Sequence, residues 1–143
     1  MFDRSLVVKR EASINATTDR IWFVLTDPST IARYLYGASL HTDWGIGSQI
    51  LFQGEYEGTK WQDKGVVREF VAGSRLAYDY WSGSCGLADL PENYARVTFA
   101  MESNSIGTVL VIEQKGYASK QSFETSGQGW ENMLSSIKTI AEE

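Results

Sequence analysis

Hydrophobic residues change their spacing along the chain, and the changes divide it into regions. Residues Ser5 to Ala12 carry an apolar cluster flanked by charge, which is typical of a strand. Between Gly45 and Gln114 apolar residues recur at every second position, which predicts strands with one buried face. Over residues 121–142 the spacing becomes three or four, which predicts a long helix. The expected order is therefore a strand, a connector, a set of strands and a terminal helix.

The connector after the first strand is predicted to form two short helices. Thr17 or Thr18 can cap the first helix, and Asp27-Pro28 ends it. Pro28 suits the first position of the second helix, because a helix needs no backbone N–H donor there. The expected buried positions of the second helix are Ile31, Tyr34 and Leu35.

Turn residues cut the middle region into five strands. The predicted strands are Ser48 to Tyr56, Thr59 to Val71, Arg75 to Trp81, Tyr94 to Ser103 and Gly107 to Lys115. Most of the breaks between them are short enough for hairpins, so neighbouring strands should pair antiparallel. The longest break, Ser82 to Glu92, is rich in glycine and serine and is expected to form a surface loop.

Two glycines fall within the predicted terminal helix. Gly127 and Gly129 should each cost about 0.8–1 kcal/mol relative to alanine in a helix interior. Either the helix begins near Gly129, or it is continuous and the missing side chains leave room for a ligand or for close contact with the sheet. The spacing pattern leaves both interpretations open. The apolar face of the helix comprises Phe123, Trp130, Met133, Leu134, Ile137, Ile140 and Ala141.

Length and charge narrow the class of protein. A chain of 143 residues predicts one α+β domain over residues 1–143. The net charge of −5 argues against nucleic acid as the main partner, because phosphate binding requires a basic surface. No apolar run approaches the roughly 20 residues of a membrane-spanning helix, so no membrane insertion is expected. The single cysteine and the polar N-terminus favour the cytoplasm.

Reactive side chains are few. His41 lies beside Asp43 in a predicted loop, where it could be a general base but is expected to be an exposed loop residue. Cys85 has no nearby base or spaced ligand partner, so we expect an inert thiol, no metal site and no cofactor. The sequence therefore presents no catalytic set.

Carboxylates in the strands are expected on solvated faces, because they alternate with apolar residues; they are Asp63, Glu69, Asp79, Glu102 and Glu113. Glu113 depends on the register of its strand. It faces outward if Leu110 and Ile112 face inward, and it is buried as a candidate acid or base if the register is reversed.

The aromatic content, with 5 Trp, 7 Tyr and 6 Phe, suits the lining of a pocket. Alternation places Leu76, Tyr78 and Tyr80 on the strand face opposite Arg75 and Asp79. Applied to every strand and to the terminal helix, this reasoning gives candidate ligand-binding residues Phe52, Tyr56, Tyr78, Tyr80, Phe99, Met101, Trp130, Met133 and Leu134. The alternative is that the same residues fill a fully packed core.

The order of elements resembles the START-like (SRPBCC) superfamily, which includes the birch-pollen-allergen fold, polyketide cyclases and lipid-transfer domains. Three sequence segments resemble those of the branch named for activators of the heat-shock-protein-ninety ATPase. They are Ile14-Asn15-Ala16, the stretch from Lys64-Gly65-Val66-Val67 to Tyr78-Asp79-Tyr80-Trp81, and Gly129-Trp130 with Met133-Leu134 and Ile137-Lys138. The resemblance spans almost the whole chain.

The resemblance implies a helix-grip fold, in which a curved antiparallel sheet wraps around the long C-terminal helix and encloses a cavity. It favours an open cavity over a packed core. We therefore expect a protein that binds a small apolar or aromatic molecule, and not an enzyme. The resemblance leaves two alternatives: a stimulator of a heat-shock chaperone ATPase, with a chaperone as partner, and an enzyme of the polyketide cyclase or hydratase type.

Overall fold

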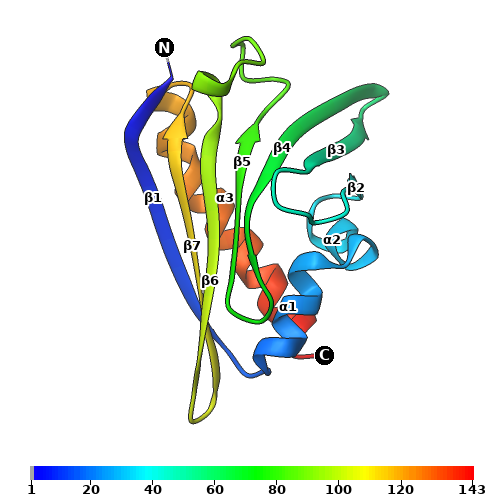
Figure 1. Cartoon of the computed structure of the whole chain (residues 1–143), viewed down its shortest axis with the longest axis vertical. Helices are drawn as coiled ribbons and strands as arrows, with labels where there is room; N and C mark the ends of the chain where they lie inside the picture. Colours follow the sequence, from blue (N-terminus) through cyan, green and yellow to red (C-terminus); the bar gives the residue numbers. More distant parts are fainter. Residues whose placement is uncertain (1) are drawn as a thin grey trace.

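The computed structural model describes residues 2–143 and contains one antiparallel sheet of seven strands. The strand order is β1-β7-β6-β5-β4-β3-β2, so the first strand in the sequence pairs with the last (Figure 1). Consecutive strands from β2 to β7 are neighbours, as hairpin connections require. The strands are β1 (Asp3–Ile14), β2 (Ser39–His41), β3 (Gln49–Tyr56), β4 (Thr59–Val71), β5 (Arg75–Trp81), β6 (Ala95–Asn104) and β7 (Gly107–Tyr117).

Three α-helices accompany the sheet within residues 2–143: α1 (Thr18–Thr26), α2 (Pro28–Tyr34) and α3 (Lys120–Ala141). Each begins at a side chain that accepts a hydrogen bond from a backbone N–H of the first turn, which would otherwise lack a partner. These caps are Thr17, Asp27 and Ser119. A short 3-10 turn (Pro91–Asn93) precedes β6.

The long helix α3 crosses one face of the sheet obliquely, with α1 beside its C-terminal end (Figure 1). The guanidinium of Arg20 on α1 donates from Nη2 to the carbonyl oxygen of Ile140, at 3.0 Å. A cation that binds the free carbonyls at a helix end stabilises that end. The hydrophobic core includes Ile21, Val24, Leu110 and Ile137, each of which is 0% exposed.

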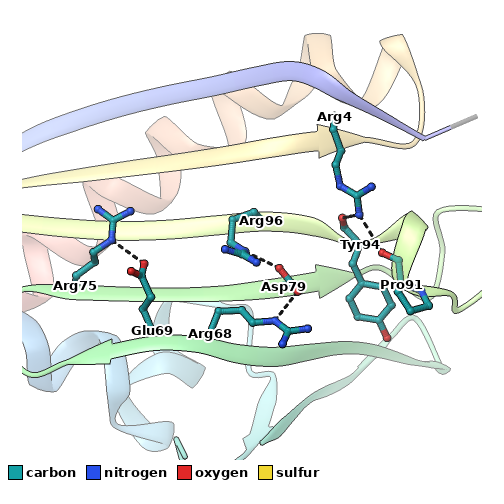
Figure 2. Close-up of polar contacts among 8 residues, drawn as sticks. All are labelled: Arg4, Arg68, Glu69, Arg75, Asp79, Pro91, Tyr94 and Arg96. Carbon is teal, nitrogen blue, oxygen red and sulfur yellow. Dashed lines mark hydrogen bonds and ion pairs between the residues drawn. The ribbon is translucent and has the colours of Figure 1, made fainter. Parts of the chain in front are cut away.

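The opposite face of the sheet carries ionic pairs, drawn in Figure 2. The carboxylate of Asp79 accepts hydrogen bonds from Arg68 Nε at 2.7 Å and from Arg96 Nε at 2.6 Å, and Arg75 pairs with Glu69 at 2.7 Å (Figure 2). Exposed pairs of this kind contribute little to stability. They do show which face is solvated, and the alternate residues of β5 therefore point toward α3.

The fold predicted from the sequence is confirmed, with differences at particular elements. The first strand extends from Asp3 to Ile14, beyond the predicted Ser5 to Ala12. The short strand β2 was not predicted, because three residues are too few to show an alternating pattern. The terminal helix is continuous through Gly127 and Gly129, so the interpretation that it begins near Gly129 is wrong. No helix within residues 2–143 is long and apolar enough to cross a membrane.

Candidate functional site

A cavity of about 280 Å³ lies between the inner face of the sheet, α2 and α3. Strands β3 to β6 supply eight of its 18 lining residues, and Trp130 and Met133 of α3 close it from the other side. Half of the 18 lining residues are aromatic: Tyr34, Tyr36, Trp44, Phe52, Trp61, Tyr78, Tyr80, Phe99 and Trp130. A cavity of this size and composition can enclose a small apolar molecule.

The rings form a connected series across the sheet. Phe52 on β3 contacts Tyr80 on β5, with ring centroids 5.7 Å apart and planes nearly perpendicular. Tyr78 lies between Phe52 and Phe99, at centroid distances of 6.0 and 6.1 Å. Phe99 in turn contacts Trp130 edge to face at 6.1 Å, which joins the sheet to α3. Such pairs hold one another in place, so the wall is preformed.

One carboxylate belongs to this wall. Asp63 on β4 accepts a hydrogen bond from the hydroxyl of Tyr80 through Oδ2. Its other oxygen, Oδ1, accepts from the backbone N–H of Gly83 at 2.9 Å. Burial raises the pKa of Tyr80 well above its usual value, and the neighbouring Asp63 adds to the shift. Tyr80 is therefore a neutral hydrogen-bond donor at pH 7, and it orients the carboxylate within the wall.

Some of the other polar groups of the wall have hydrogen-bond partners in the protein, and the Tyr78 hydroxyl does not. The Tyr34 hydroxyl donates to the carbonyl oxygen of Val24 at 2.9 Å, and Trp130 Nε1 donates to Gln114 Oε1 at 3.1 Å. The Tyr78 hydroxyl makes no hydrogen bond within residues 2–143, and burial raises the pKa of Tyr78. Tyr78 is therefore a phenol of the wall whose hydroxyl can bind a ligand.

A second hollow, of about 320 Å³, adjoins the cavity. It shares Tyr34, Tyr36, Trp130 and Met133 with the cavity and includes polar residues of α2 and α3. Tyr36 at this boundary is 91% exposed and has a positive φ of 54°. The shared residues indicate that the cavity opens between the end of α2 and the middle of α3.

Six predicted ligand-binding residues line the cavity: Phe52, Tyr78, Tyr80, Phe99, Trp130 and Met133. Met101 and Leu134 are buried, but they belong to the packed core and not to the lining. Tyr56 lies outside the cavity and is 72% exposed. It occurs at the last position of β3, next to the Glu57-Gly58 turn, where the alternation continues but the side chain is exposed.

Sequence reasoning missed several residues of the wall, among them Asp63, Trp61, Trp44 and Gln114. Asp63 was expected on a solvated face. On β4, however, it shares a face with Trp61 and with Val67, which is 0% exposed. This alternation of odd-numbered residues on β4 was the feature of the sequence that could have placed Asp63 on the inner face. It was obscured because charged residues occur on both faces of this strand.

The remaining candidates lie away from the cavity. His41 is the exposed last residue of β2, so its predicted place in a loop is wrong, although its exposure was expected. Glu113 lies 3.6 Å from Lys115 Nζ, while Leu110 and Ile112 are buried, so the outward register applies. Cys85 is a partly buried free thiol. Within residues 2–143, no three His, Cys, Asp or Glu side chains are grouped to hold a metal.

Comparison with solved structures supports this architecture. A protein from Cytophaga hutchinsonii, with a solution structure, is 32% identical, with a TM-score of 0.83 over 96% of this chain and 94% of that one. The AHSA1-like protein from Aeromonas hydrophila is 17% identical, with a TM-score of 0.76 over 95% of this chain and 92% of that one. CalU16 from Micromonospora echinospora is 19% identical, with a TM-score of 0.69 over 99% of this chain and 83% of that one.

No curated protein matches the chain. Residues 15–142 match the protein family described as "Activator of Hsp90 ATPase homolog 1-like protein". The match includes every element of the structure from α1 to α3 and therefore the whole cavity wall. The chain belongs to this family of Activator of Hsp90 ATPase homolog 1-like proteins.

Proposed function

We propose that this protein binds a small, largely apolar or aromatic molecule in the cavity between the sheet and α3. The observation that carries the proposal is the partly open cavity of about 280 Å³ with its wall of aromatic rings. For scale, an engineered apolar cavity of about 150 Å³ binds benzene. A molecule with two fused rings and a short polar substituent is therefore a suitable size.

The energetics favour binding because the wall is apolar and preformed. Burying apolar surface contributes a favourable free energy of about 25 cal/mol per Å². Binding would bury apolar surface of both the ligand and the cavity wall. The ring contacts between Phe52, Tyr78 and Phe99 exist without a ligand, so little side-chain ordering opposes binding. Orientation would come from the few polar groups of the wall.

Calorimetric titration with naphthylethanol, a neutral bicyclic probe, tests the proposal. We expect saturable binding that is lost in Val97→Phe, because Val97 lines the cavity and a phenyl ring would occupy the space. Val111→Phe is the matched control. It makes the same change on the outer face of the neighbouring strand β7, where Val111 is partly exposed.

Met133→Trp supplies a second obstruction at the rim of the cavity, in case overpacking unfolds the Val97 variant. Thermal unfolding of each variant identifies the folded ones. If a folded, obstructed variant binds naphthylethanol with the same affinity and heat as the wild type, the ligand binds elsewhere and the proposal is overturned.

A second candidate function follows from the family match over residues 15–142, whose description concerns an activator of the Hsp90 ATPase. Under this hypothesis the protein raises the rate of ATP hydrolysis by the chaperone of its own cell. Steady-state hydrolysis should rise with added protein and saturate. An unchanged rate at a large excess of protein would reject the hypothesis. The cyclase or hydratase activity and the cytoplasmic location stay predictions.

A further inference from the structure

We infer that the cavity selects a ligand whose aromatic or apolar body carries a protonated amine, and that the ammonium pairs with the carboxylate of Asp63. The inference rests on the proposed function, since it names the chemical class of the molecule in the same cavity. It follows from the charges of the wall, from the rings around Asp63 and from the hydrogen bonds that this carboxylate already accepts.

Asp63 is the only charged residue of the cavity lining within residues 2–143, and no Lys, Arg or His belongs to that lining. The next residue, Lys64, points to the opposite face of β4, and its Nζ pairs with Asp89 at 2.9 Å. A carboxylate beside an apolar space is stabilised by a cation and repels an anion. The wall therefore favours a cationic ligand over a neutral one, and a neutral one over an anionic one.

Three aromatic residues are neighbours of Asp63 in the sheet and the cavity wall. Phe52 is the cross-strand partner of Asp63, Trp61 precedes it by two residues on the same face of β4, and Tyr80 donates its hydroxyl to it. All three rings line the cavity. The face of an aromatic ring attracts a cation within about 6 Å of its centroid. A group of rings with one carboxylate is thus a favourable environment for an ammonium group.

The carboxylate of Asp63 retains acceptor capacity. Its Oδ1 accepts from the Gly83 N–H and its Oδ2 from the Tyr80 hydroxyl, which uses two of about four lone-pair directions. Both donors are neutral, and no cationic side chain within residues 2–143 pairs with Asp63, so its negative charge is left for a ligand. An ammonium group can donate to the remaining positions in a charge-assisted hydrogen bond, which is stronger than a neutral one.

Three ligands that share one ring system test the inference by calorimetry: naphthylethylamine, the neutral naphthylethanol and the anionic naphthylacetate. On the wild-type chain at pH 7 we expect the amine to bind about tenfold more tightly than the alcohol, and the acid most weakly. This comparison requires no variant, so a failure to fold cannot obscure it.

Asp63→Asn removes the charge. Its single carbonyl oxygen can still accept from the Gly83 N–H, and its NH2 group can donate to the Tyr80 hydroxyl oxygen, which is able to accept as well as donate. It should bring the ratio of amine to alcohol affinity close to one, with alcohol affinity changed less than about twofold. Glu102→Gln, an exposed carboxylate of β6, is the control and should retain the wild-type ratio.

The outcomes separate this inference from the function on which it rests. Alcohol binding as tight as amine binding in the wild type, or an amine preference that survives in Asp63→Asn, overturns the inference and leaves the proposed function standing. Absence of binding by all three ligands rejects the proposed function for bicyclic aromatics, and the inference falls with it. Tightest binding of the acid would show that a cation outside the wall governs selection, which also overturns the inference.

Discussion

The indole ring of Trp61 lies against Gly54, its cross-strand partner on β3. A Cβ at position 54 would overlap Cζ2, Cε2 and Nε1 of the indole, so the glycine allows Trp61 to take its place in the cavity wall. Glycine usually weakens a strand, but at position 54 it allows the close approach of the indole ring.

Gly54→Ala should displace Trp61 from the wall. We expect naphthylethanol to bind several-fold more weakly, and the free energy of unfolding to fall by about 1–3 kcal/mol, as is typical of overpacking. Calorimetry and urea unfolding measure the two effects. Gln53→Ala, on the other face of β3, is the control. In the Trp61→Ala background, Gly54→Ala should cost little stability, because the ring that the new Cβ would meet is gone. If Gly54→Ala costs the same free energy of unfolding with and without the Trp61 ring, the contact does not explain its effect.

Tyr34 ties α2 to α1 through its hydrogen bond to the Val24 carbonyl oxygen, at 2.9 Å. Tyr34→Phe keeps the ring and removes the hydroxyl, which leaves a buried carbonyl oxygen unsatisfied. The free energy of unfolding should fall by about 1–3 kcal/mol, the desolvation cost of such a group. Tyr36→Phe is the matched control, because Tyr36 is 91% exposed. Equal urea midpoints for the Tyr34 variant and the wild type would show that this bond contributes nothing.

The two glycines of α3 predict different responses to alanine. A Cβ on Gly129 meets open space, so Gly129→Ala should stabilise the protein by about 0.8–1 kcal/mol through helix propensity. A Cβ on Gly127 would overlap the guanidinium of Arg10, which lies across the helix, so Gly127→Ala should gain less.

Urea unfolding of a double variant isolates the reason for this difference. In the background of Arg10→Ala the obstruction is gone, and Gly127→Ala should then stabilise the protein as much as Gly129→Ala does. If Gly127→Ala gains equally in both backgrounds, Arg10 does not restrict this position.

Alternation and helical spacing predicted nearly all of the fold, because each element except β2 is long enough to show its period. The same patterns predicted which way Tyr78 and Tyr80 point. They could not separate Phe99, which lines the cavity, from Met101, which is packed, because both share a face of β6. That difference depends on where α2 and α3 lie over the sheet, which no local spacing encodes.

The polar part of the site was harder to predict. Asp63 is charged, and a charged residue in a strand usually indicates solvent. Its place in the wall depends on Tyr80 from β5 and on the Gly83 backbone, which are 17 and 20 residues away in the sequence. Contacts at such separations form only once the sheet is assembled. Buried strand neighbours such as Val67 are the one local sign of an inward carboxylate.

Asp27 predicts how stability depends on acid pH. It caps α2, and its Oδ2 accepts hydrogen bonds from the hydroxyls of Thr30 and Ser29, at 2.7 Å each, and from the Thr30 backbone N–H at 3.0 Å. These bonds favour the carboxylate and lower the pKa of Asp27 below its usual value of 3.8, the Thr30 hydroxyl having the largest effect. The folded protein therefore binds a proton here less readily than the unfolded chain does.

Because the folded pKa is the lower one, the contribution of Asp27 is complete above pH 3.8 and is lost as the pH falls through the folded value. Asp27→Asn keeps a capping oxygen but cannot titrate. We expect the variant to be less stable than the wild type at pH 7, and the difference in their urea midpoints to shrink steadily as the pH is lowered from about 4. Glu102→Gln, at an exposed site, reports the general effect of removing one negative charge. A difference that stays constant over this range would show that the cap acts through geometry alone and that its charge contributes nothing.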